Sequence, residues 1–216
     1  MVSDPTMRTL VLSFGLLSIA FSGCESDSAS PNEPEPKPSL KLAGVSPDRF
    51  ECSSVTTTQA LAKVLGAPAR AIESASSVPN GIARPCEYEI ATAIPEIWTY
   101  DLDCRDGYKR RADSLFEQYR QQNADRIASY NQVSDAGAIK PNDAGVVYKQ
   151  PGAATDIAVG AKGLDHNDQA VIFIDDDAPC YVRVFGPDAQ RRLELSKLIA
   201  KNLTFANAPM KPRPFK

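Results

Sequence analysis

Three segments of the chain alternate apolar and polar residues and carry a cysteine at one end, and this feature limits the fold most. They are CEYEIATA from Cys86, IWTYDLDC up to Cys104 and CYVRVFG from Cys180. Side chains of a β-strand point alternately to the two faces of a sheet. Each segment is therefore predicted to be a strand whose cysteine shares a face with its apolar residues, and the core is expected to form on a sheet.

The first 23 residues have the features of a secretory signal peptide. The basic residue Arg8 precedes an apolar run, Leu10–Phe21, and small Ser22 and Gly23 come directly before Cys24. The run is too short to span a membrane, which takes about 20 residues. A cysteine at this place resembles the lipobox of bacterial lipoproteins. The resemblance implies cleavage before Cys24 and acylation of its thiol with chains such as palmitate, which would give a stable membrane anchor. The alternative is an ordinary signal peptide whose cysteine joins a disulfide.

Residues 24–49 contain prolines at 31, 34, 36, 38 and 47 among serines and acids, with almost nothing to bury. Such a segment does not offset its ordering entropy, so it is predicted to be a flexible tether, extended by about 3 Å per residue at its proline-rich centre. A single domain is predicted over residues 50–204, followed by a disordered basic tail, 205–216. The apolar content of 43% is enough for a core, and the net charge of -3 gives no sign of a nucleic-acid partner.

If Cys24 carries a lipid, four cysteines remain. An even number in an exported domain predicts two disulfides, with three possible connectivities. The strand pattern favours Cys104–Cys180, because both residues end strands on the apolar face. This leaves Cys52–Cys86 to join the first helix to the first strand. No CxxC pair occurs, and the spacings differ from those of zinc sites, so no metal site is predicted at these sulfurs.

Three segments have the pattern of helices. In TTTQALAKVLG, Thr56 is the expected N-cap, Gln59 completes a capping box and Gly66 ends the helix. Residues 108–131 form the longest predicted helix, with one apolar stripe, and residues 188–203 form the last. Strands are predicted at 86–92, 97–104 and 145–149, and in TDIAVGAKGL, QAVIFI and CYVRVFG. The predicted class is α+β, with a largely antiparallel sheet of about five to six strands packed against three helices.

This order of elements resembles small lipoproteins of actinobacterial cell envelopes, including LpqN-type domains of unknown function. The matching segments are ECSSVTTTQALAKVLG, PCEYEI and CYVRVFGPDAQRRLELSKLIAKNL. The likeness covers most of residues 50–203. Tyr88 stands where that family often has tryptophan, and Cys104 and Cys180 are additions. The family has no agreed catalytic residues, so the resemblance implies a fold and an envelope location without an activity.

The single histidine, His166, lies in LDHNDQ beside Asp165 and Asp168. These residues could form a metal site or an acid–base pair. Asp, Asn and His also favour turns between strands, and a turn is the preferred interpretation. The sequence contains no G-x-S-x-G elbow, phosphate loop or dinucleotide fingerprint. No catalytic residue, metal ligand or cofactor is therefore predicted.

Two acidic sets and one aromatic set complete the candidates. Asp175–Asp177 are predicted to be a solvated hairpin tip rather than a calcium site. Asp101 and Asp103 are predicted to lie on an outward polar strand face rather than to act as a glycosidase pair. Core packing is expected for the aromatic set, but a groove between the sheet and the long helix would be the best ligand surface. The set is Trp98, Tyr108, Phe116, Tyr119 and Tyr130.

Together these features predict a protein lipid-anchored to a membrane of the bacterial cell envelope, facing the periplasm or the exterior. It is expected to act by binding a protein or small ligand rather than by catalysis. An envelope hydrolase that uses His166 or the acidic hairpin, and a carrier of an apolar small molecule, are the alternatives. The predicted partners are the membrane, through the anchor, and an envelope protein or apolar ligand.

Overall fold

The computed structural model describes residues 42–106, 108–135, 150–167 and 169–214. The chain divides into two units, Met1–Ser39 and Leu40–Lys216, and all described residues belong to the second. Cys24, the predicted signal peptide and the predicted strand at 145–149 lie outside the described residues.

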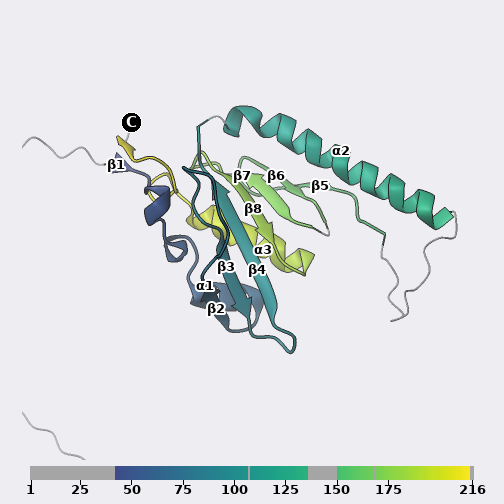
Figure 1. Ribbon diagram of the computed structural model, residues 1–216, viewed down its shortest axis with the longest axis horizontal. Helices are drawn as coiled ribbons and strands as arrows, with labels where there is room; N and C mark the ends of the chain where they lie inside the picture. Colours follow the sequence, from purple (N-terminus) through teal and green to yellow (C-terminus); the bar gives the residue numbers. More distant parts are fainter. Residues whose placement is uncertain (1–41, 107, 136–149, 168, 215–216) are drawn as a thin grey trace, which may run out of the picture. The chain divides into compact units, whose positions relative to one another are not determined.

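A seven-stranded, fully antiparallel sheet forms the centre of the domain (Figure 1). β8 lies between β4 and β7, so the hairpin β7–β8 connects strands β2, β3 and β4 on one side of the sheet to strands β6 and β5 on the other. The predicted α+β class is confirmed, with more strands than expected. In spatial order the strands are β2 (Ala69–Ile72), β3 (Cys86–Ile90), β4 (Glu96–Asp103), β8 (Tyr181–Phe185), β7 (Val171–Ile174), β6 (Lys162–Asp165) and β5 (Thr155–Ile157).

The extra strands have a local cause. The segment TDIAVGAKGL, predicted as one strand, is a hairpin of β5 and β6. Gly160 has a φ of 61°, in the left-handed region that favours glycine, and it reverses the chain there. β2 was not predicted because ARAI does not alternate clearly, and its two central residues are exposed at the sheet edge.

The two faces of the sheet carry different helices. α1 (Thr58–Leu65) and α3 (Ala189–Asn202) pack on the face that holds the larger core, which includes Trp98, Tyr100, Phe173, Val182, Val184, Leu195 and Ile199. α2 (Tyr108–Asp135) packs on the opposite face, where Phe116 contacts a smaller cluster containing Leu164 and Ile172. Figure 1 shows α2 alongside β6 and β7. None of the helices in the described ranges is both long and apolar enough to cross a membrane.

The first helix begins one residue later than predicted. Thr57 is the N-cap of α1, and its side chain accepts a hydrogen bond from the backbone N–H of Ala60 at 3.1 Å. Thr56 is instead buried, and its hydroxyl lies 3.1 Å from the Tyr88 hydroxyl and 2.8 Å from the Tyr100 hydroxyl. The hydroxyl groups of these two core tyrosines need a hydrogen-bond partner inside the protein. The Thr56 side chain serves as that partner, so Thr57 caps the helix instead.

Both predicted disulfides are confirmed. Cys52–Cys86 joins the 3-10 helix Cys52–Ser54 to the start of β3, and Cys104–Cys180 joins the end of β4 to the start of β8. On the chain-entropy model each bridge constrains the unfolded chain by about 4 kcal/mol.

The ends of the domain differ from prediction. β1 (Leu42–Ala43) pairs with β9 (Arg213–Pro214), and a 3-10 helix follows at Pro47–Arg49. Residues 205–214 are therefore not a disordered tail, and residues 42–49, predicted to belong to the flexible tether, are part of the folded domain. Ala208 and Met210 are buried against the main core, which explains why this basic segment is held.

Candidate functional site

A cavity of about 410 Å³ lies on the face of the sheet that carries α2. We call it the paired-charge pocket. Its walls are the loop 76–85 and two residues of α2, Leu115 and Tyr119; its polar floor consists of Asp101, Asp103, Arg105, Tyr181 and Arg183. Small-molecule sites usually enclose about 300–1,000 Å³, so the cavity is of a suitable size.

The floor results from strand alternation and register. Asp101 lies opposite Arg183, and Asp103 opposite Tyr181, in the antiparallel pair β4–β8. Asp101 accepts hydrogen bonds from Nε of Arg183 at 2.9 Å and from Nη2 at 2.8 Å. Asp103 accepts from Nε of Arg105 at 3.0 Å and from Nη2 at 2.7 Å. Two bidentate ion pairs thus lie side by side, a geometry that fixes both side chains of each pair.

In both pairs the carboxylate lies deeper than the guanidinium. The side chains of Asp101 and Asp103 are 16% and 10% exposed, whereas those of Arg183 and Arg105 are 42% and 45% exposed. The prediction of an outward face for the two aspartates is thus correct about the side of the strand, but they are not solvated. Loop 76–85, α2 and the two arginines cover them.

Burial changes the acid–base properties of the floor. Burial raises the pKa of Asp101, although the hydrogen bonds and charge of Arg183 oppose the rise. For Arg183 burial acts against the charge, but the hydrogen bonds and charge of Asp101 prevail and raise its pKa above the usual value. Burial, followed by a hydrogen bond with Tyr119, raises the pKa of Tyr181 well above its ordinary range. The Tyr181 hydroxyl therefore stays protonated.

His166 lies in a separate, smaller cavity of about 90 Å³, which shares Tyr119 and Arg183 with the paired-charge pocket. Its backbone N–H donates to the carbonyl of Ala170 at 2.8 Å, and Asn167 has a φ of 52°, so the predicted turn is confirmed. The ring is buried: Nε2 lies 3.3 Å from the carbonyl oxygen of Tyr119, and the two rings meet edge to face. Asp168 lies outside the described residues.

The acidic hairpin agrees with the predicted solvated tip at Asp176 and Asp177, which are exposed, and differs from it at Asp175. Asp175 is 1% exposed, and its Oδ2 accepts hydrogen bonds from the backbone N–H groups of Asp177 and Ala178 at 3.1 and 2.7 Å. Asp177 accepts from the N–H of Phe205 at 3.0 Å. Burial raises the pKa of Asp175 to about 6, with a contribution from the charge of Asp176. Asp175 and Asp177 thus accept backbone hydrogen bonds around the turn, and in the described ranges no three His, Cys, Asp or Glu side chains are placed to hold a metal ion.

Core packing, the expected role of the aromatic set, is found for Trp98 and Phe116, and the alternative of one aromatic groove does not form. Trp98 is fully buried on the opposite face of the sheet from α2, with the guanidinium of Arg191 5.3 Å from its ring. Phe116 belongs to the smaller core. Tyr119 lines the paired-charge pocket, Tyr130 is half-buried on α2, and nothing is described for the side chain of Tyr108.

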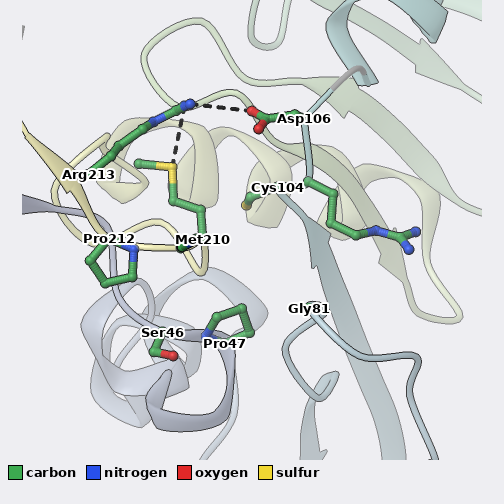
Figure 2. Close-up of a pocket in the computed structure, with 10 residues that line it drawn as sticks. Ser46, Pro47, Gly81, Cys104, Asp106, Met210, Pro212 and Arg213 are labelled. Atoms are coloured by element: carbon green, nitrogen blue, oxygen red, sulfur yellow. Dashed lines mark hydrogen bonds and ion pairs between the residues drawn. The ribbon is translucent and has the colours of Figure 1, made fainter.

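A second cavity, of about 390 Å³, lies beside the C-terminal segment (Figure 2). Arg213 donates to Asp106 at 3.3 Å and to the sulfur of Met210 at 3.7 Å, and Pro47 faces this group across the cavity. Arg105 lines this cavity and the paired-charge pocket. The lining of this second cavity holds one ion pair joined by a single hydrogen bond, Arg213–Asp106, whereas the paired-charge pocket holds two bidentate pairs, which makes the second cavity the weaker candidate.

Sequence reasoning missed Arg105, Tyr181 and Arg183. The alternation in YDLDC and YVRVF placed Asp101 and Arg183 on the polar side of their strands, but it did not reveal that the strands are neighbours. Comparisons of the chain with protein-family models, curated proteins and solved structures found no match.

Proposed function

We propose that the protein is a lipid-anchored component of the bacterial cell envelope that binds a small ligand in the paired-charge pocket. The anchor is proposed from the lipobox-like sequence ending at Cys24, in line with the resemblance to LpqN-type lipoproteins. The two disulfides support an oxidising compartment, where such bonds persist.

One observation carries the binding proposal: two ion pairs, Asp101–Arg183 and Asp103–Arg105, lie together in a cavity. Ion pairs with partly exposed arginines typically contribute about 0–1 kcal/mol each, so these pairs add little to the stability of the fold. Recognition of a polar ligand gives this floor a role that stability alone does not. The charged floor also argues against an apolar cargo.

Binding is favoured over catalysis by the way the groups are engaged. Both carboxylates of the floor accept bidentate hydrogen bonds from arginine, which fix their position and leave neither oriented as a general acid or base toward the cavity. His166, the base of the alternative hydrolase, has its Nε2 near the Tyr119 carbonyl, in the adjacent smaller cavity.

The test is a screen of the mature, full-length chain with a library of polar small molecules, followed by amide and arginine Nε chemical shifts. Hits are expected to shift the signals of Tyr119, Arg105 and Arg183 first. Arg183→Met is expected to lose these hits, and Arg70→Met, which removes an exposed cross-strand pair with Glu89, is the matched control. Hits that shift other regions, or that survive Arg183→Met, would show that the pocket is not the binding site.

A further inference from the structure

The paired-charge pocket is balanced in charge, and this balance limits the kind of ligand that fits. Its lining holds two carboxylates, Asp101 and Asp103, and two guanidinium groups, Arg105 and Arg183. An anionic group that approaches an arginine also approaches a buried carboxylate, and a cationic group meets the reverse conflict. A ligand with many polar groups and no net charge avoids both penalties.

The Asp101–Arg183 pair also presents a donor beside an acceptor. Arg183 uses Nε and Nη2 for Asp101, and within the described residues no hydrogen-bond acceptor lies on its Nη1. Asp101 accepts two bonds out of the roughly four that a carboxylate can accept. A hydroxyl group both donates one hydrogen bond and accepts others. Two neighbouring hydroxyls of one ligand can therefore bind the carboxylate and the guanidinium of the same pair.

The walls complement the floor. α2 contributes Tyr119 and Leu115 to the lining, and the loop 76–85 contributes apolar residues that include Val78, Pro79 and Ile82. These surfaces suit the C–H faces of a saturated ring. The floor lies on two paired strands and is held by bidentate bonds, so little ordering is needed when a ligand binds.

From this combination we infer that the ligand of the paired-charge pocket is an uncharged carbohydrate, bound through neighbouring hydroxyls to the Asp101–Arg183 pair. The inference rests on the proposed function, because it names the ligand class of the same pocket. It also fits the proposed location, since a protein anchored in the envelope lies close to polysaccharide.

The experiment compares sugars that share a ring and differ in charge. Glucose, glucosamine and glucuronate form one set, and galactose, galactosamine and galacturonate another; maltose and lactose extend the neutral members. Each is titrated into the mature, full-length protein in a slightly acidic buffer, and binding is followed by amide and arginine Nε chemical shifts. At least one neutral sugar is expected to bind with a dissociation constant at or below about 1 mM, and its charged counterparts at least tenfold more weakly.

Variants then assign the binding to the Asp101–Arg183 pair. Arg183→Met and Asp101→Asn are each expected to weaken the neutral sugar at least tenfold, while Arg70→Met, at an exposed pair on β2 and β3, leaves it unchanged. If a variant does not fold, the charge comparison on the unaltered protein decides the question alone.

The outcomes separate the two proposals. Tighter binding of glucuronate or glucosamine than of glucose, with shifts in the pocket, overturns the inference that the ligand is uncharged. The same result supports the proposal that the pocket is the binding site. Absence of binding by every neutral sugar also overturns the inference. The library screen then tests separately whether the pocket binds any small ligand. Sugar binding that shifts residues elsewhere overturns both.

Discussion

Replacement of Asp175 by asparagine is expected to stabilise the protein at neutral pH. Asp175 is buried at the turn between β7 and β8, where Oδ2 accepts two backbone hydrogen bonds. Among the described residues its Oδ1 is buried without a hydrogen-bond partner. The oxygen of asparagine can accept the same two bonds, and the substitution removes a buried negative charge.

The magnitude follows from the pKa. Burial raises the pKa of Asp175 from 3.8 to about 6. The folded state therefore keeps a proton that the unfolded state loses between about pH 4 and pH 6, so this residue's contribution to stability falls as the pH rises through that window. At about 1.4 kcal/mol for each pKa unit, the charged carboxylate costs the folded protein roughly 3 kcal/mol at neutral pH. Asp175→Asn avoids this cost near pH 7 and gives no such advantage near pH 4.

Urea denaturation at the two pH values measures the difference, with the fluorescence of Trp98 as the probe. Trp98 is the single tryptophan and is fully buried, so its emission reports loss of the core. Asp113→Asn is the control, because Asp113 makes an exposed pair with Lys162 that is worth about 1 kcal/mol or less at either pH. The reasoning is refuted if Asp175→Asn is no more stable than the wild type near pH 7, or if its advantage is the same near pH 4.

Three further predictions follow from the fold and the anchor. Thr56→Val leaves the buried hydroxyls of Tyr88 and Tyr100 without the Thr56 hydroxyl and is expected to lower the free energy of unfolding by about 1–3 kcal/mol; Thr57→Val, which removes only the helix cap, separates the two roles. Met210→Ala is expected to cost about 2 kcal/mol or more in urea denaturation, because Met210 is buried in the main core; an unchanged midpoint would mean that this segment is free. Cys24→Ala is expected to release the protein from the membrane fraction, and intact mass should lose the acyl groups; recovery of unacylated wild-type protein in the soluble fraction would contradict the anchor.

Local patterns predicted the sheet well where each strand has a cysteine and alternating apolar residues. CEYEI, IWTYDLDC and CYVRVF have one buried face, so periodicity identifies both the strands and the side that carries the sulfurs. The same strand ends then favoured the disulfide pairing that the structure confirms. Short or exposed strands such as β2 carry no such signal, because a strand without a buried face does not need alternating apolar and polar residues.

The pocket could not be predicted, because it depends on contacts between residues far apart in the chain. Asp101 and Arg183 are 82 residues apart, and they pair only because β8 lies beside β4. The burial of the aspartates depends further on the loop 76–85 and on α2. For the same reason the alternative of a single aromatic groove could not be tested from the sequence: Trp98 and Tyr119 lie on opposite faces of the sheet.

The position of Cys52 has a mechanical consequence for a domain held by its N-terminal side. Tension applied ahead of Leu42 would first separate the two-residue ribbon β1–β9 and then unwind the short helix at Pro47–Arg49. Unravelling would stop at Cys52, since a covalent bond passes the load from there to Cys86 in the sheet. Tension through the proposed N-terminal anchor would thus strip about ten residues and leave the strands that form the pocket floor in place.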